Sequence, residues 1–245
     1  MNLPPHLKDE LLSLRYRKHR EASGLLIVEG RSQIRELADS SWKVRYAVSS
    51  KRGRPPEMPP DLPLYYAEPS LIARISELQH SPELLVCAEY AVAAFDSLNP
   101  LKPIVFTDRI SDPGNLGTML RTGEWFGITQ WLIGPGTVDP YNAKVVRAAM
   151  GSLPRLTLVA SVLPLEELQA LRKSGMRIVA SVPDSGGAVM LRQNDCLLFG
   201  SEAHGLGKEY IELSDAKYSI GRNGTTESLN VAIAFAIAAY SLPTA

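Results

Sequence analysis

Three stretches of the chain combine glycines with polar side chains in patterns that could support chemistry. The first, residues 112–127, carries Asn115 and Arg121 in a segment that follows a short apolar run and has helical spacing. On a helix, Arg121 points about 100° away from the core-facing Leu120. A single guanidinium is thereby directed away from the core near the turn, either as a functional group or as a solvated surface arginine.

The second stretch, residues 200–207, follows an apolar run and contains Gly200 and Gly205. Its spacing is not the GxGxxG fingerprint of dinucleotide-binding folds, and its glycine-lysine pair precedes glutamate, which excludes a P-loop. An NAD enzyme is therefore disfavoured. Glycines allow the backbone to approach a ligand closely, so amides and carbonyls could bind an adenine or a ribose. Glu202 adds an acceptor for a hydroxyl or an amine.

The third stretch, Ser228 to Asn230, precedes an Ala-rich segment, residues 231–240, that is apolar on every side. Either Ser228 or Asn230 could cap this helix or serve the site. A helix that is apolar all round must be covered on both sides. The cover could come from the core of the chain or from a second copy of it.

The elements around these stretches predict an α/β fold. Five runs with strand-like composition alternate with helical segments: residues 103–107, 131–133, 156–159, 177–181 and 196–199. The last run is apolar throughout, which is typical of a strand covered on both faces. We expect a mostly parallel sheet in a domain of residues 96–245, preceded by a smaller α/β unit of residues 1–95.

Composition places the chain among ordinary cytoplasmic proteins. It is 45% hydrophobic and 21% charged, and it contains no run of about 18 apolar residues and no signal-peptide pattern. We therefore expect no membrane contact. Cys87 and Cys196 stand alone, without a CxxC pair or a nearby His cluster, which predicts two small buried side chains and no metal site or disulfide.

The net charge of zero hides a basic N-terminus. Residues 1–54 hold 12 basic and 6 acidic side chains, whereas residues 55–245 hold 14 and 20. A basic segment on an acidic body favours contact with a nucleic acid, although a solvated basic helix and a long connecting loop are equally good readings of the charge alone. The basic residues expected to contact RNA are Arg15, Arg17, Lys18, Arg20, Arg52 and Arg54.

Taken in order, the three stretches resemble the motifs of the SpoU (TrmH) family of RNA 2′-O-ribose methyltransferases. Residues 145–151 also resemble the family's VRASMG stretch, with Ala149 in place of serine. Residues 17–20 and 26–30 resemble the L30e-type substrate-binding domain that precedes the catalytic domain in many members. No single motif would suffice, but three in order at suitable spacing are specific.

This resemblance implies a SPOUT fold with a C-terminal trefoil knot, S-adenosylmethionine as the cofactor, and a homodimer formed through the C-terminal domain. The residues that would hold the cofactor are Gly200, Gly205, Ile220 and Leu229. Those that would line the reaction site are Asn115, Arg121, Glu202, Ser228 and Asn230. One departure is residues 219–222, which lack the Pro and Met that many members have before the third motif.

Methyl transfer to a ribose hydroxyl is an in-line displacement that needs a positioned donor and acceptor and no metal. Because a guanidinium is a poor base, we expect Arg121 to grip a neighbouring phosphate, while that phosphate or water takes the hydroxyl proton. The expected substrate is 23S rRNA, since an L30e-like domain suits a folded RNA element. The alternatives are the same chemistry on tRNA and a catalytically silent knotted protein that binds RNA or assists assembly.

Overall fold

The chain forms two compact units in the computed structural model, which describes residues 1–38, 40–56, 58–76, 81–184 and 189–243. The first unit comprises Met1–Ala91 and Asp139–Arg155, and the second comprises Val92–Val138 and Leu156–Ala245. The first crossing between units, after Ala91, thus lies just before the expected domain boundary at residues 95 and 96. The second segment of the first unit was expected in the C-terminal domain instead.

The segment Asp139–Arg155 belongs to the first unit because of its packing there. Its helix α6 (Ala143–Ala148) packs on strand β1, and it ends in a short 3₁₀ helix, Leu153–Arg155. Gly151 lies so close to Glu36 that a Cβ would come within 2.5 Å of that side chain, and the Ser41 hydroxyl donates to the Pro154 carbonyl at 2.9 Å. Sequence periodicity along one segment carries no information about such partners.

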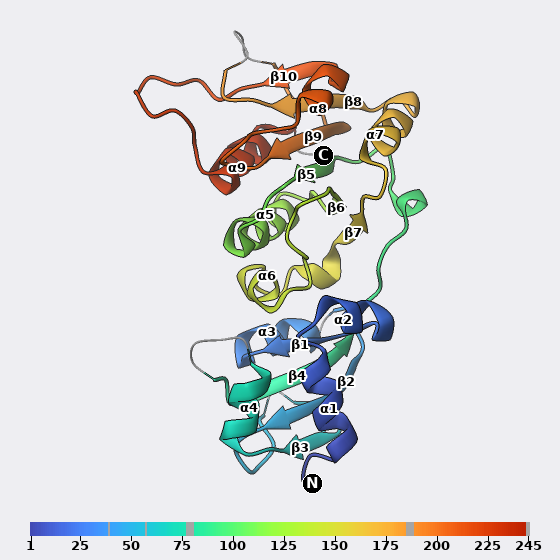
Figure 1. Ribbon diagram of the computed structural model, residues 1–245, viewed down its shortest axis with the longest axis vertical. Coiled ribbons are helices and arrows are strands. Elements are labelled where there is room, and N and C mark those ends of the chain that lie inside the picture. The colour runs from blue at the N-terminus through green and yellow to red at the C-terminus, as the bar shows by residue number, and fades with distance from the viewer. Residues whose placement is uncertain (39, 57, 77–80, 185–188, 244–245) are drawn as a thin grey trace. The chain divides into compact units, whose positions relative to one another are not determined.

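The first unit is built on a four-stranded mixed sheet (Figure 1). In spatial order its strands are β1 (Leu25–Glu29), β4 (Leu84–Glu89), β2 (Val44–Ser49) and β3 (Leu64–Tyr66). Strand β4 is antiparallel to both neighbours, and β2 and β3 are parallel. Its N-terminal helices are α1 (Pro5–Ser13), α2 (Arg17–Ser23), α3 (Arg31–Ala38) and α4 (Pro69–Ile75).

The second unit contains a six-stranded sheet in which every neighbouring pair is parallel. In spatial order its strands are β10 (Ala216–Tyr218), β8 (Arg177–Ser181), β9 (Asp195–Gly200), β5 (Ile104–Asp108), β6 (Gln130–Ile133) and β7 (Thr157–Ala160). The predicted parallel α/β domain is confirmed. The three-residue edge strand β10 was not predicted, because an alternation of only three residues is too short to indicate a strand.

Helices cover both faces of this sheet. A 3₁₀ turn, Phe95–Ser97, leads into the unit. On one face, α9 (Val231–Ser241) packs beside α5 (Pro113–Trp125), and Phe235 contacts Trp131 of β6. On the other face lie α7 (Pro164–Lys173) and α8 (Lys208–Leu213), where Tyr210 contacts Phe106 of β5. This arrangement leaves the carboxyl ends of the strands open for a ligand site.

Helix α5 is fixed at both ends by its sequence. The Asp112 carboxylate accepts a hydrogen bond of 2.8 Å from the Asn115 amide, and Pro113 occupies the first helical position. Gly127, with a φ of +75°, follows its last turn. Gly123 packs on the Trp131 indole, where a Cβ would lie 2.5 Å from a ring atom. Asn115 is thereby held in the first turn.

Helix α9 buries only one of its apolar faces within the chain. Phe235 and Ala238 are fully buried, whereas Ile233 is 52%, Ile237 37% and Tyr240 78% exposed. The expectation that both sides are covered is therefore not met within this chain. Cys87 and Cys196 are free and buried, as predicted. No helix in the described ranges is long and apolar enough to cross a bilayer.

Candidate cofactor cavity and reaction site

A cavity of about 370 Å³ opens at the carboxyl ends of β8 and β9. Its walls come from three segments that are far apart in sequence: residues 181–183, residues 199–206 and residues 220–231. All four residues expected to hold the cofactor, Gly200, Gly205, Ile220 and Leu229, are among its lining residues, as are Glu202 and Ser228. A volume of this size suits a small-molecule ligand or cofactor.

Gly200 is the position where the cavity wall tolerates no side chain. A Cβ built there would collide with backbone atoms of Gly205 and Leu206. Gly205 itself has a φ of +64°, and its amide donates to the Ser201 carbonyl at 2.8 Å, which closes a tight turn. The glycines thus let two backbone segments meet at the cavity wall, leaving backbone groups available to a ligand.

Asn230 joins the first and second motifs. Its side-chain nitrogen donates to the Asn115 side-chain oxygen at 3.0 Å and to the Glu202 carboxylate at 2.5 Å. Its side-chain oxygen caps α9 by accepting from the amides of Ala232 and Ile233. Asn230 therefore caps α9 and also contacts Asn115 and Glu202, whereas Ser228 lies at the cavity and is not the cap.

Arg121 lies outside this network. It is six residues beyond Asn115 on α5, about 9 Å further along the helix axis. Its side chain is exposed, as predicted, and no ion pair joins it to any other residue that the structure describes. The guanidinium is therefore available for an anion, although it does not line the cavity.

Arg20, expected at the RNA surface, is buried. It is 5% exposed, pairs with Asp139, and donates to the carbonyls of Leu14 and Arg15 at 2.8 and 2.9 Å. A guanidinium with these partners holds α2 and the segment beginning at Asp139 together within the first unit. We therefore remove Arg20 from the set of expected RNA contacts. In sequence it could not be told apart from its basic neighbours, because burial depends on a partner 119 residues away.

The other five basic residues are exposed. Arg15 donates to the Arg74 carbonyl at 3.1 Å, and Arg17 pairs with Glu21 at 2.7 Å on the same helix. The Arg52 guanidinium lies over the Tyr66 ring at 4.9 Å, and Arg54 donates to the Leu62 carbonyl at 2.9 Å. Lys18 lies between Arg17 and Glu21 in the sequence of α2. Exposed pairs of this kind are weak, so a phosphate could compete for these groups.

Several residues that line the cavity were not predicted from the sequence. Ser181, Val182 and Pro183 follow β8, and Arg222, Thr226 and Glu227 belong to the segment after β10. The usable signal for the first three was their place after the carboxyl end of a parallel strand. Within the described ranges, no group of three or more His, Cys, Asp or Glu side chains could hold a metal ion.

Comparison with known proteins agrees with this geometry. The chain is 25% identical over 233 residues to the 23S rRNA (guanosine(2553)-2′-O)-methyltransferase RlmP of Bacillus subtilis, covering 94% of this chain and 92% of that protein. A TrmH-family protein from Porphyromonas gingivalis, 28% identical, superposes with a TM-score of 0.82 and 98% coverage of both chains. AviRb of Streptomyces viridochromogenes, solved with AdoMet, superposes with a TM-score of 0.85 over 97% of each chain; at 24% identity it supports the fold alone.

Two family descriptions divide the chain between them. Residues 5–86 match the MRM3-like substrate binding domain. Residues 102–240, which contain all three motifs, match the SpoU rRNA Methylase family. The chain belongs to the SpoU rRNA Methylase family.

Proposed function

We propose that this protein is an S-adenosylmethionine-dependent RNA 2′-O-ribose methyltransferase that acts on 23S rRNA in the cytoplasm. The observation that carries the proposal is the hydrogen-bonded group of Asn115, Glu202 and Asn230 beside the glycine-walled cavity. RlmP, which aligns over nearly the whole chain, is named for this chemistry on 23S rRNA.

The residues present suit the cofactor. The cavity offers backbone groups around Gly200 and Gly205, apolar surface from Ile220 and Leu229, and a carboxylate at Glu202. S-adenosylmethionine supplies an electrophilic methyl group on a sulfonium when bound. Apolar and backbone groups can enclose its neutral parts, while a carboxylate suits a cation or a ribose hydroxyl.

The reaction requires this chain to hold a ribose 2′-hydroxyl in line with the methyl group. We assign the ribose to the side of the cavity where Asn115 and Asn230 meet Glu202, with Ser228 as a further hydroxyl partner. Arg121 is exposed on the same helix as Asn115, and we assign it a grip on the adjacent phosphate. The phosphate or water then accepts the proton, because a guanidinium remains protonated at neutral pH.

Residues 1–95 are assigned to RNA binding as an L30e-like domain. The exposed Arg15, Arg17, Lys18, Arg52 and Arg54 lie in this domain, where they would contact phosphates. An exposed arginine over a tyrosine ring, as at Arg52 and Tyr66, is also a platform on which an unstacked base can stack. Folded rRNA rather than tRNA is favoured because RlmP, a homologue that spans both units, is named for 23S rRNA.

A homodimer through the C-terminal domain would cover the apolar face of α9 that this chain leaves exposed. The Phe126 ring centroid lies 6.2 Å from that of Tyr240, and the adjacent Trp125 is 81% exposed. We also propose that residues 219–230 complete a trefoil knot. The support for it is that residues 199–206 and residues 220–231, which are separate in sequence, line one cavity.

The test combines calorimetric binding of S-adenosylmethionine with transfer of a labelled methyl group to 23S rRNA fragments and to tRNA. Wild-type protein should bind about one cofactor per subunit and label rRNA. Gly200→Arg should abolish both, whereas Val162→Arg, at a side chain that is 80% exposed, should retain both. Labelling of tRNA alone would make tRNA the substrate instead of 23S rRNA. If the protein does not bind S-adenosylmethionine even with RNA present, it is a catalytically silent RNA-binding protein.

A further inference from the structure

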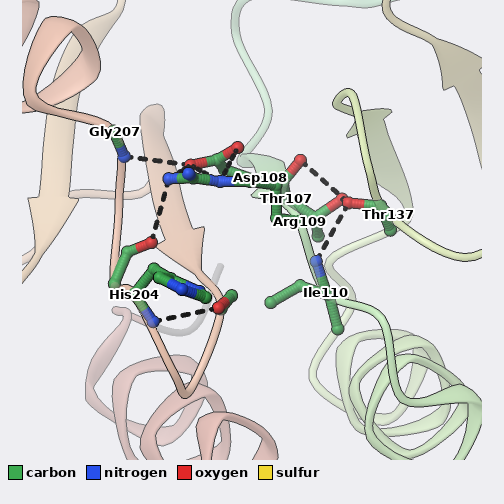
Figure 2. Close-up of polar contacts among 9 residues, drawn as sticks. Thr107, Asp108, Arg109, Ile110, Thr137, His204 and Gly207 are labelled. Carbon is green, nitrogen blue, oxygen red and sulfur yellow. Dashed lines mark hydrogen bonds and ion pairs between the residues drawn. The ribbon is translucent and has the colours of Figure 1, made fainter.

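Beneath the cavity wall, two adjacent residues at the carboxyl end of β5 form an unusual pair. Asp108 is 2% exposed, and the Arg109 guanidinium donates to both of its carboxylate oxygens at 2.8 to 3.2 Å. The hydrogen bonds from Arg109 to Asp108 raise the pKa of the arginine above its ordinary value. Figure 2 shows the guanidinium lying along the carboxylate of its own neighbour.

This pair reaches the 200–207 loop at two points (Figure 2). The Gly207 amide donates to the Asp108 carboxylate at 2.9 Å in a buried position, and Arg109 donates to the Gly205 carbonyl at 3.5 Å. Gly205 and Leu206 line the cavity and carry the backbone atoms that meet Gly200. The loop is therefore held at the end where it forms the cavity wall.

The backbone at Arg109 is unfavourable for its residue type. Its φ is +56°, a conformation that side chains other than glycine and asparagine rarely adopt. Neighbouring contacts hold it there: its amide donates to the Pro135 carbonyl at 3.1 Å, and its stem lies against Gly136. Thr137 accepts from the Ile110 amide at 3.3 Å. Backbone strain maintained in this way is typical of functional sites.

From this geometry we propose that Asp108 and Arg109 are positioning residues of methyl transfer, which set the conformation of the 200–207 loop for the cofactor. The proposal rests on the proposed function, because it assigns these residues to the cofactor cavity. Neither side chain lines that cavity. They act through the backbone of Gly205 to Gly207, and their loss should weaken cofactor binding without altering RNA binding.

The decisive variant is Arg109→Gly. Glycine accepts a positive φ without strain, so the variant relieves the backbone while it removes the guanidinium. This relief offsets part of the stability to urea that is lost when the buried Asp108 carboxylate loses its ion pair. We expect the Kd for S-adenosylhomocysteine to rise about fivefold or more, which is the effect of losing about 1 kcal/mol. The Kd for RNA should stay within about twofold of wild type.

A comparison of Asp108 with Asp195 distinguishes a positioning role in the 200–207 loop from a general contribution to stability. Asp195, at the start of β9, is fully buried and takes a bidentate pair from Arg177 at 2.6 and 2.9 Å. Asp108→Asn should weaken cofactor binding and speed hydrogen exchange in residues 201–207. Asp195→Asn should lower stability while leaving both readouts unchanged, since its carboxylate accepts from Arg177 and the Arg192 amide rather than from the 200–207 loop.

Two results would overturn the proposal: wild-type cofactor affinity in Arg109→Gly, or equal effects of Asp108→Asn and Asp195→Asn on the loop. Hydrogen exchange is measured without cofactor, so it tests the tether even if the proposed function fails. If wild-type protein binds no S-adenosylhomocysteine at all, the proposed function fails instead. The two failures are therefore distinguishable.

Discussion

Asn230 donates a hydrogen bond of 3.0 Å to Asn115, a residue 115 positions earlier in the chain. The same nitrogen reaches Glu202, so one amide group connects all three family motifs. Because its oxygen also caps α9, the orientation of the amide is fixed by the helix that follows it. The Asn230 side chain thus both connects the three motifs and caps the C-terminal helix.

Asn230→Asp should separate these two roles. Aspartate caps a helix as well as asparagine does, so stability should change little, but the donor is lost and a second carboxylate faces Glu202. We expect turnover to fall by about tenfold or more, measured by methyl transfer to RNA. The matched control is Asn142→Asp, since Asn142 caps α6 by accepting from Lys144 at 2.9 Å. Equal turnover in both variants would contradict the assigned role.

Arg121→Lys tests the phosphate grip. Lysine keeps the charge but lacks the planar fork that binds a phosphate through two donors. RNA binding should stay within about threefold of wild type, while turnover falls by about 100-fold through misplacement of the ribose. Arg172→Lys is the control, because Arg172 is an exposed helix residue paired with Asp215. Undiminished turnover in the Arg121 variant would exclude an essential role.

Ile237→Glu should disrupt the proposed dimer. It places a charge on the exposed apolar face of α9, where burial against a second copy would leave it without a partner. Sedimentation should show a monomer, or a dimer Kd raised by about 100-fold. Val162→Glu is matched in character, since Val162 is 80% exposed away from this face. A wild type that sediments as a monomer would contradict the dimer directly.

The two cysteines should be inert in the folded protein. Burial raises the pKa of Cys87 to about 12 and also raises the pKa of Cys196. At pH 8 neither forms the reactive thiolate, so a chromogenic disulfide reagent should modify both only after unfolding.

The raised pKa of Cys87 also makes the free energy of unfolding depend on pH. Below pH about 9, both states hold the Cys87 proton, so the free energy of unfolding is unaffected. Between about 9 and about 12 the unfolded chain ionises first, and the free energy of unfolding should decrease. Urea titrations across this range should show a smaller decrease for Cys87→Ala. Rapid modification of the native protein at pH 8 would contradict the buried assignment.

The sequence alone determined the local features of this protein. Strand-like runs of three to five residues predicted β5, β6, β7, β8 and β9. The glycines of the 200–207 loop and the polar residues Asn115, Glu202 and Asn230 predicted a ligand site. These features depend on spacing and residue type within a short segment, which periodicity and motif patterns record directly.

Only the tertiary structure determined which residues, distant in sequence, contact one another. In the sequence Arg20 could not be told apart from its basic neighbours, but its pairing with Asp139 buries it in the first unit. The sequence also left open how much of α9 the chain itself covers, and the structure leaves Ile233 52% exposed. The contact from Asp108 to Gly207 spans 99 residues. Such contacts depend on how distant segments return to one another in the fold, and no local pattern encodes that path. The family motifs predicted the site, and the fold determined which side chains surround the predicted residues.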